Sequence, residues 1–379
     1  MALLDLHAHF PMHTRFPPRF TEGPPPVDKE LEYWVAQHLL NYQNGNPRVS
    51  LQELVDGAPG GIASVLYDPD DEFFRDANPR PEAFPNLLAQ MDNVEAEIQG
   101  DVTLARNPAQ VRACLERSEK FLVHCVERAF GLGGVASNVE ALAHRGVAYV
   151  VVAHLFYRGV ATCTNAIPFL PDIIFDVINP QPDVGLTPLG RDIVSGLLDN
   201  RILVDITTSS SLAQDQIFQI AADYRAPVIS SHTGVRPTSD YPLNLSPETV
   251  LKIKDSKGVI GVIIAPHWLR QRAQDFFPDG HIELVLMAID AIQQITDSFD
   301  QIAIGTDLDG FIKPVDECPD WAHTTVLASA IEAKYGTANA EKILWRNALD
   351  VLERWWKGTT DSPRATAAPA ASETPQGPE

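Results

Sequence analysis

The sequence predicts an α/β protein built as a (β/α)8 TIM barrel. Short, almost wholly apolar segments alternate with amphipathic helical segments along the chain, which is typical of parallel strands buried on both faces. Eight such units fit into about 350 residues, as a closed (β/α)8 barrel requires. Several of the apolar segments also end in histidine, aspartate or glutamate, and the active sites of such barrels lie at the strand ends.

Composition narrows the class of protein. The chain has 379 residues, of which 45% are hydrophobic and 21% charged, and its formal net charge is −21 at pH 7. That charge argues against a nucleic-acid or anionic-membrane partner. The four cysteines form no CxxC pattern and indicate reduced thiols. No segment is long and apolar enough to span a bilayer, and no signal peptide precedes the first strand, so we expect a cytoplasmic protein.

The strands follow from the apolar runs. The first strand begins with the run at 2–4 and leads directly into His7 and His9. A small strand-like piece is expected at 101–104. The other strands are expected at residues 62–67, 121–127, 147–154, 202–206, 227–232, 259–265 and 301–307.

Capping signals place the helices. Ser50 with Glu53 three residues later forms a capping box, Asn107 precedes a proline at the first helical position, and Gly146 stops a helix. Helices between the strands are expected at 82–98, 107–118, 135–145, 187–200, 212–224, 246–255 and 281–295. Two more, at 321–334 and 338–356, close the domain.

We expect one domain, a barrel over residues 1–357 with a long loop insertion at about 11–60. The insertion is rich in proline, carries one helical pattern at 28–42, and is expected to cover the site. Residues 358–379 combine prolines with small and polar residues and show no apolar face, so we expect a disordered tail.

Ligand-type side chains recur at the predicted strand ends. Residues two apart on a strand share a face, so His7 and His9 direct two imidazoles to one spot. Burial of such groups at the ends of apolar runs is costly unless a metal ion or a partner compensates. The further members of this set are Glu127, His154, His232 and Asp307. Metal-assisted hydrolysis uses such a set, because the ion activates water and polarises the scissile carbonyl.

The order and spacing of several motifs resemble those of the membrane (renal) dipeptidases, zinc metallopeptidases of the amidohydrolase superfamily. The matching stretches are 5–9, Glu127, 146–154, 185–191, 205–206, 227–232, 244–245, 305–310 and 341–344 with Asn347. The resemblance implies a metal-dependent hydrolase that holds one or two divalent ions, zinc in the family, and cleaves a small amide or dipeptide-like substrate. It also suggests a homodimer.

The resemblance further implies a role for each site residue. His7 and His9 would bind the first metal, Glu127 would bridge two metals, and His232 would bind the second. His154 would contact the substrate carbonyl and help to stabilise the oxyanion. Asp307 would manage the proton of the nucleophilic water or grip the substrate amine.

Three departures from the family pattern change this expectation. His9 stands where the family usually has aspartate, which the wider superfamily tolerates. Thr208 stands where a histidine binds the second metal, and threonine is a poor zinc ligand at neutral pH. Leu243 replaces the arginine that grips the substrate carboxylate; Arg236 or Arg270 could take its place.

These departures favour a one-metal site held by His7, His9 and Asp307, with Glu127 as a possible fourth ligand. Two alternatives stay open. One is a single-metal amidohydrolase or lactonase with a non-peptide substrate, and the other is a non-catalytic binding scaffold, because one barrel hosts many chemistries.

Other residues near the predicted strand ends have separate expectations. His267 and Trp268 follow the seventh strand, where the family places a substrate-contacting tyrosine, so they are expected to line the pocket. His13 lies in the first loop and could reach the site. His124 stands three residues before Glu127 and should face away from the barrel interior. Asp205 lies inside a strand and is expected to hold a neighbouring backbone group.

Overall fold

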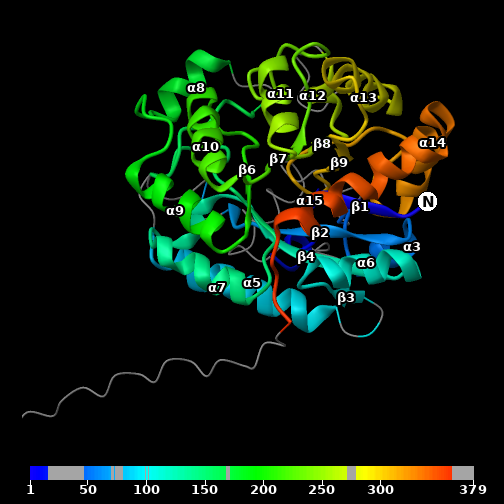
Figure 1. The fold of residues 1–379 in the computed structure, drawn as a ribbon, viewed down its shortest axis with the longest axis horizontal. Coiled ribbons are helices and arrows are strands. Elements are labelled where there is room, and N and C mark those ends of the chain that lie inside the picture. The colour runs from blue at the N-terminus through cyan, green and yellow to red at the C-terminus, as the bar shows by residue number, and fades with distance from the viewer. Residues whose placement is uncertain are drawn as a thin grey trace, which may run out of the picture.

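A parallel sheet rolled into a barrel forms the centre of the molecule (Figure 1). The computed structural model describes residues 1–15, 47–69, 72, 80–98, 100, 102–167, 171–270 and 279–360. Neighbouring strands follow the order β1-β2-β4-β5-β6-β7-β8-β9. Their bounds are β1 Leu3–Ala8, β2 Gly60–Leu66, β4 Lys120–Val126, β5 Tyr149–Val151, β6 Leu203–Asp205, β7 Val228–Thr233, β8 Ile260–Val262 and β9 Ile302–Ile304.

The barrel closes between its first and last strands. A parallel bridge joins Ala8 to Leu308, just beyond β9. The amide of His9 donates to the carbonyl oxygen of Leu308 at 2.9 Å, and the amide of Asp307 donates to that of His7 at 2.8 Å. The predicted (β/α)8 architecture is therefore confirmed, and its closing seam runs through three of the expected site residues.

The small strand expected at 101–104 is also present. It is β3, Val102–Leu104, and it pairs in parallel with the first half of β4 through Lys120, Phe121 and Leu122. β5 meets β4 only at the other end, at Val126. β3 therefore widens the sheet at the amino-terminal end of β4, away from the carboxyl end that leads to Glu127.

Helices surround the sheet and begin where capping residues stand (Figure 1). The side chain of Asn107 accepts a hydrogen bond from the amide of Gln110 at 3.0 Å. The bounds are α1 Met12–Arg15, α3 Leu51–Asp56, α5 Ala83–Glu97, α6 Pro108–Arg117, α7 Val139–His144, α8 Asp172–Ile178, α9 Pro188–Asp199, α10 Ser211–Tyr224, α11 Pro247–Asp255, α12 Pro266–Leu269, α13 Ile282–Thr296, α14 Thr324–Glu341 and α15 Asn347–Trp355.

Some elements differ from expectation. Five of the described strands, namely β3, β5, β6, β8 and β9, are only three residues long. At β5 and β9 the chain leaves the ladder before its ligand-type residue: His154 lies beyond β5, and Asp307, with φ 59°, lies beyond β9. Helix α8 lies between β5 and α9, where the sequence predicts no helix. The helix expected at 28–42 and most of the tail expected at 358–379 lie outside the described residues.

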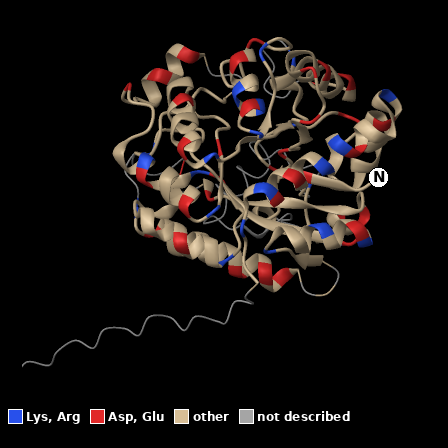
Figure 2. Ribbon diagram, in the orientation of Figure 1, with Lys and Arg blue, Asp and Glu red and all other residues tan. Residues whose placement is uncertain are grey.

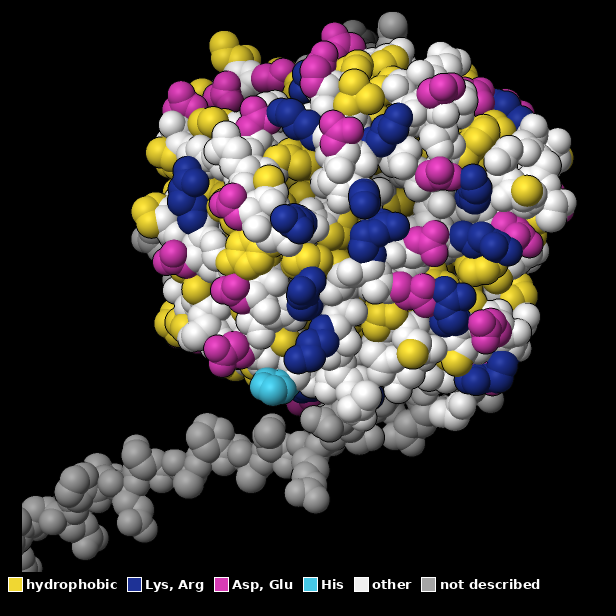
Figure 3. Space-filling view, in the orientation of Figure 1, with side chains coloured by type: hydrophobic (Ala, Val, Ile, Leu, Met, Phe, Trp, Pro, Cys, Tyr) yellow, Lys and Arg dark blue, Asp and Glu magenta, His cyan; other side chains and the backbone are white. Residues whose placement is uncertain are grey.

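Charge is carried mainly by the outer helices and the loops (Figure 2). Despite the net charge of −21, lysine and arginine side chains gather across the middle of the face in Figure 3, over α15. Grooves on this face are lined by residues that include Lys257 and Arg354. Among the described residues, no helix combines the length and apolar character needed to cross a bilayer.

Candidate metal centre and active site

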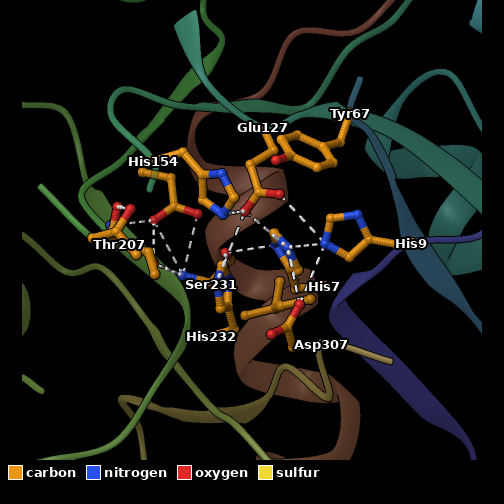
Figure 4. Close-up of polar contacts among 12 residues, drawn as sticks. His7, His9, Tyr67, Glu127, His154, Thr207, Ser231, His232 and Asp307 are labelled. Carbon is orange, nitrogen blue, oxygen red and sulfur yellow. Dashed lines mark hydrogen bonds and ion pairs between the residues drawn. The ribbon is translucent and has the colours of Figure 1, made fainter. Parts of the chain in front are cut away.

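The two histidines of the first strand meet at the centre of the site (Figure 4). His7 lies within β1 and His9 directly follows it, and the two residues are 0% and 1% exposed. Their Nε2 atoms stand 3.3 Å apart. The i, i+2 spacing thus directs both rings to one point, as strand alternation predicts.

Glu127 reaches the same point from the end of β4. Its Oε1 lies 3.4 Å from Nε2 of His7, and its Oε2 lies 3.4 Å from Nε2 of His9. Both oxygens are buried and have no hydrogen-bond partner among the described residues. Burial would raise the pKa of Glu127, but His154 and His9 outweigh it and hold that pKa well below its usual range. An ionised carboxylate with unsatisfied oxygens is suited to a cation.

Asp307 and His232 complete the group. Oδ1 of Asp307 lies 3.3 Å from Nε2 of His9 and 3.8 Å from Nε2 of His7. His232, on β7, places its Nε2 3.9 Å from Oε1 of Glu127. Burial, together with the neighbouring His7, holds the pKa of His232 well below its ordinary value, so this imidazole is neutral and able to ligate.

Two overlapping triads have ligand atoms within 4.8 Å of one another: His7, His9 and Asp307, and His7, Glu127 and His232. Imidazole and carboxylate ligands in such triads fit a divalent cation, and catalytic zinc sites commonly use three protein ligands. His7 belongs to both triads, so a single residue connects the two candidate positions.

His7 is oriented by its other ring nitrogen. Nδ1 lies 3.0 Å from Oη of Tyr149 and 2.9 Å from Oγ of Ser231. Since the Tyr149 hydroxyl donates to the carbonyl oxygen of Leu6 at 2.6 Å, it is available to accept from Nδ1–H. That arrangement leaves the lone pair of Nε2 directed toward Glu127, which is the tautomer a metal ligand needs.

Asp5 links the first strand of the barrel to the segment after the last strand through hydrogen bonds. It accepts hydrogen bonds from the amide of Thr306 at 2.8 Å, from the hydroxyl of Thr306 at 2.5 Å and from the amide of His7 at 3.1 Å. Full burial raises the pKa of Asp5 to about 7. This carboxyl group therefore stabilises the junction where the first and last strands close the barrel, and it sets the relative positions of His7 and Asp307.

His154 approaches Glu127 from β5. Its Nε2 lies 3.4 Å from Oε1 of Glu127, and its Nδ1 lies 2.7 Å from Oε2 of Glu72. Burial alone would lower the pKa of His154, but the two carboxylates outweigh it and raise that pKa to about 9.

The comparisons with known proteins agree with this geometry. The family model of membrane dipeptidases, peptidase family M19, matches residues 1–362. The chain belongs to the membrane dipeptidase family. The resemblance seen in the sequence is thereby confirmed, and with it the class of dipeptidase-type metallohydrolases.

Individual relatives of this membrane dipeptidase family member are distant. It is 26% identical over 275 residues to an uncharacterised protein of Klebsiella pneumoniae, covering 71% of this chain and 95% of that protein. It is 24% identical over 242 residues to an uncharacterised dipeptidase of Schizosaccharomyces pombe, covering 62% of this chain and 52% of that one. The matched region thus spans about half the length of the second relative.

A solved structure shows the same fold. It is a metallopeptidase of Rhodobacter sphaeroides liganded with a phosphinate mimic of the dipeptide L-Ala-D-Ala. Its TM-score is 0.73 at 19% identity, and the match covers 94% of this chain and 99% of that one.

The departures from the family pattern are visible in the structure. The Thr208 hydroxyl donates to backbone carbonyl oxygens, that of Ala153 at 2.8 Å among them, so it is engaged away from the metal ligands. Leu243 is buried. Arg236 donates to the carbonyl oxygen of Asn244 at 3.1 Å, and Arg270 to that of Asp279 at 3.0 Å. These contacts of Arg236 and Arg270 are with the backbone of their own loops.

The pocket residues expected after the seventh strand both lie in α12 and are buried. The ring of Trp268 stands 5.8 Å from that of His232, between ring centroids, and therefore lies beside the site. The ring of His267 lies 6.3 Å from that of Trp268, between ring centroids. Burial lowers the pKa of His267 to about 3, so this imidazole is neutral.

Three other residues have positions that separate them from the ligands. His13, which its place in the first loop could have brought to the site, pairs with Glu97 at 2.8 Å, and no contact within the described part of the chain joins it to the ligands. His124 faces outward toward Glu95 at 3.4 Å, as its odd spacing predicts. Asp205 accepts from the amides of Thr207 and Ser231 at 2.9 and 3.2 Å, in agreement with a backbone-holding role.

Sequence reasoning missed the residues that orient the site, namely Tyr149, Ser231, Tyr67 and Glu72. Tyr149 and Ser231 read as ordinary strand residues, and their partner His7 is more than a hundred positions away. Glu72 stands close to three aspartates in the sequence, and no spacing distinguishes it. The sequence therefore offered no signal for them.

Proposed function

We propose that this protein is a metal-dependent hydrolase that cleaves a small amide or dipeptide-like substrate. The observation that carries the proposal is the buried carboxylate of Glu127, whose two oxygens lie among three imidazoles without a hydrogen-bond partner in the described residues. The Rhodobacter sphaeroides structure, which binds a dipeptide mimic, supports the substrate class.

The ligand types favour zinc. His7, His9 and Asp307 supply two imidazoles and one carboxylate, and Glu127 with His232 extends the set. When bound, the ion supplies an activated water and polarises the scissile carbonyl. We propose zinc as this ion.

The protein's own groups have separate tasks. Asp307, beside both histidines of the first strand, is placed to accept the proton of the attacking water. His154, whose Nε2 lies 3.4 Å from Oε1 of Glu127, is placed to contact the carbonyl oxygen and stabilise the oxyanion. Trp268 forms an apolar wall beside His232, and His267 supports it.

We further propose a single functional metal position, at His7, His9 and Asp307. The second triad lacks the additional imidazole that the family supplies, because Thr208 stands there and its hydroxyl is engaged with the backbone. Elemental analysis of protein produced with zinc is expected to give close to one ion per chain. A value near two would contradict the single position, and a value near zero would leave the binding-scaffold alternative.

Dipeptide hydrolysis tests the proposed function directly. The zinc-loaded protein is expected to cleave some members of a broad dipeptide panel, measured by release of free amino acids. A chelator such as 1,10-phenanthroline is expected to abolish the activity, and added zinc to restore it. Chelation that leaves the rate unchanged would exclude a metal-dependent reaction.

A second substrate class is favoured by one observation. Leu243 is buried where the family has its carboxylate-binding arginine, and Arg236 and Arg270 bind backbone carbonyl groups. A substrate without a free carboxylate, such as a lactone or an acylated amine, would not need that arginine. Turnover of these compounds with a silent dipeptide panel would assign the protein to this alternative.

Three further expectations stand on the sequence alone and remain proposals. These are a cytoplasmic location, a homodimeric assembly and a single barrel domain over residues 1–357. Light scattering of the purified protein would test the assembly.

A further inference from the structure

Glu72 is a buried carboxylate beside the site whose two oxygens are both engaged. Oε2 accepts from the Tyr67 hydroxyl at 2.7 Å and lies 2.7 Å from Nδ1 of His154. Oε1 accepts from the amide of Phe156 at 3.0 Å. The side chain is 0% exposed. A buried carboxylate with three partners holds those partners in fixed relative positions.

The hydrogen bond between Glu72 and His154 determines which nitrogen of the His154 ring faces Glu127. An ionised carboxylate only accepts hydrogen bonds, so Nδ1 of His154 carries the proton that it donates to Glu72. The opposite nitrogen, Nε2, then points to Oε1 of Glu127 at 3.4 Å. The His154 ring cannot turn over without breaking a charge-assisted hydrogen bond in a buried site.

Glu72 is ionised despite its burial. Burial would raise its pKa, but His154 and Arg128 outweigh that effect and hold the pKa of Glu72 at about 2. The backbone next to His154 is held by the same residue, because Phe156 follows His154 by two positions and donates to Glu72. Arg158 in turn donates to the backbone carbonyl of Glu72.

We propose that Glu72 is a positioning residue that fixes the orientation of the His154 ring through its Nδ1–H, so that Nε2 faces the reacting carbonyl group. Its catalytic consequence rests on the function proposed above, whereas the hydrogen bond itself does not. Among the described residues, no hydrogen bond or ion pair joins Glu72 to a metal-ligating side chain, so we infer that it acts on the site through His154. In metal-assisted catalysis, residues of this kind matter because they hold the acting group in its productive geometry.

Histidine NMR on the metal-free wild-type protein tests the hydrogen bond without any substrate. Long-range ¹H–¹⁵N spectra are expected to show an imidazole with a downfield Nδ1 proton whose signal is absent in His154→Ala. The signal is expected to move upfield in Glu72→Gln. A wild-type spectrum in which Nδ1 of His154 carries no proton would overturn the proposal, and this measurement does not depend on the folding of a Glu72 variant.

A double-mutant cycle tests the consequence for catalysis. Glu72→Gln keeps the size of the side chain but removes its charge, and it is expected to lower kcat about 10–100-fold with KM nearly unchanged. In the His154→Ala background, the same substitution is expected to cause no further loss. An equal loss in both backgrounds would show that Glu72 acts independently of His154 and would overturn the proposal.

Glu97→Gln is the matched control. Glu97 also forms a short contact with a histidine, 2.8 Å to His13, but that pair lies away from the ligands. The control is expected to retain wild-type kcat and metal content. If the wild-type protein cleaves no substrate of either class, the proposed function fails, and the NMR result alone then decides the assignment of Glu72.

Discussion

Replacement of Glu127 by glutamine is expected to lower kcat by about a thousandfold or more, equivalent to about 4 kcal/mol of transition-state stabilisation. The carboxylate lies within 3.4 Å of His7, His9 and His154 and carries the negative charge at the centre of the site. An amide of equal size removes that charge and turns one metal-facing oxygen into a donor group. Steady-state kinetics and elemental analysis of the same preparation check the result.

Glu119→Gln provides the matched control for this substitution. Glu119 immediately precedes β4, the strand that ends at Glu127, but its side chain is exposed and pairs with Arg117 at 2.7 Å on the surface. Exposed pairs contribute little, so activity, metal content and melting temperature are expected to match the wild type. Retention of full activity in Glu127→Gln would refute the proposed site.

Gly310→Ala is expected to lower activity about 100-fold or more, although Gly310 carries no functional group. A methyl group at this position would lie 1.8 Å from Oδ1 of Asp307 and 2.8 Å from Cδ2 of His9, so one of these side chains must move. Misplacement of a catalytic group by about 1 Å can cost about 100-fold in rate. Overpacking is also expected to destabilise the fold by about 1–3 kcal/mol, measurable by urea unfolding.

Gly196→Ala separates this effect from the general effect of adding a methyl group. Gly196 lies inside α9, and a methyl group there would make only ordinary contacts, with Val139 Cγ2 at 3.8 Å the nearest. Alanine in a helix interior is expected to stabilise the protein by about 0.5–1 kcal/mol and to leave the rate unchanged. Wild-type kinetics in Gly310→Ala would show that Asp307 tolerates displacement and has no catalytic task.

Much of the framework was predictable because the signals are local. Apolar runs alternating with capped helices predicted the barrel, and the i, i+2 spacing of His7 and His9 predicted their common direction. The convergence of Glu127, His154, His232 and Asp307 followed from one topological rule, that the carboxyl ends of parallel barrel strands meet at one face. The observed distances agree with that expectation.

The sequence left possibilities open where a residue's direction depends on its neighbours in space. His13 had the residue type and the place in the chain to join the site, but Glu97 on α5 holds it elsewhere. Arg236 and Arg270 could have replaced the missing carboxylate clamp, but both donate to nearby backbone carbonyl groups. Such pairings are decided by packing between segments distant in the sequence.

The sequence by itself determined the barrel, the family and the set of candidate ligands, because apolar periodicity and strand-end residues are properties of short segments. Only the tertiary structure decided how those ligands are oriented. Tyr149 and Ser231 direct His7, and Glu72 directs His154, through hydrogen bonds whose partners stand 82 to 224 positions apart. Such a bond forms only when the closed barrel brings its two ends together, and no local pattern encodes it.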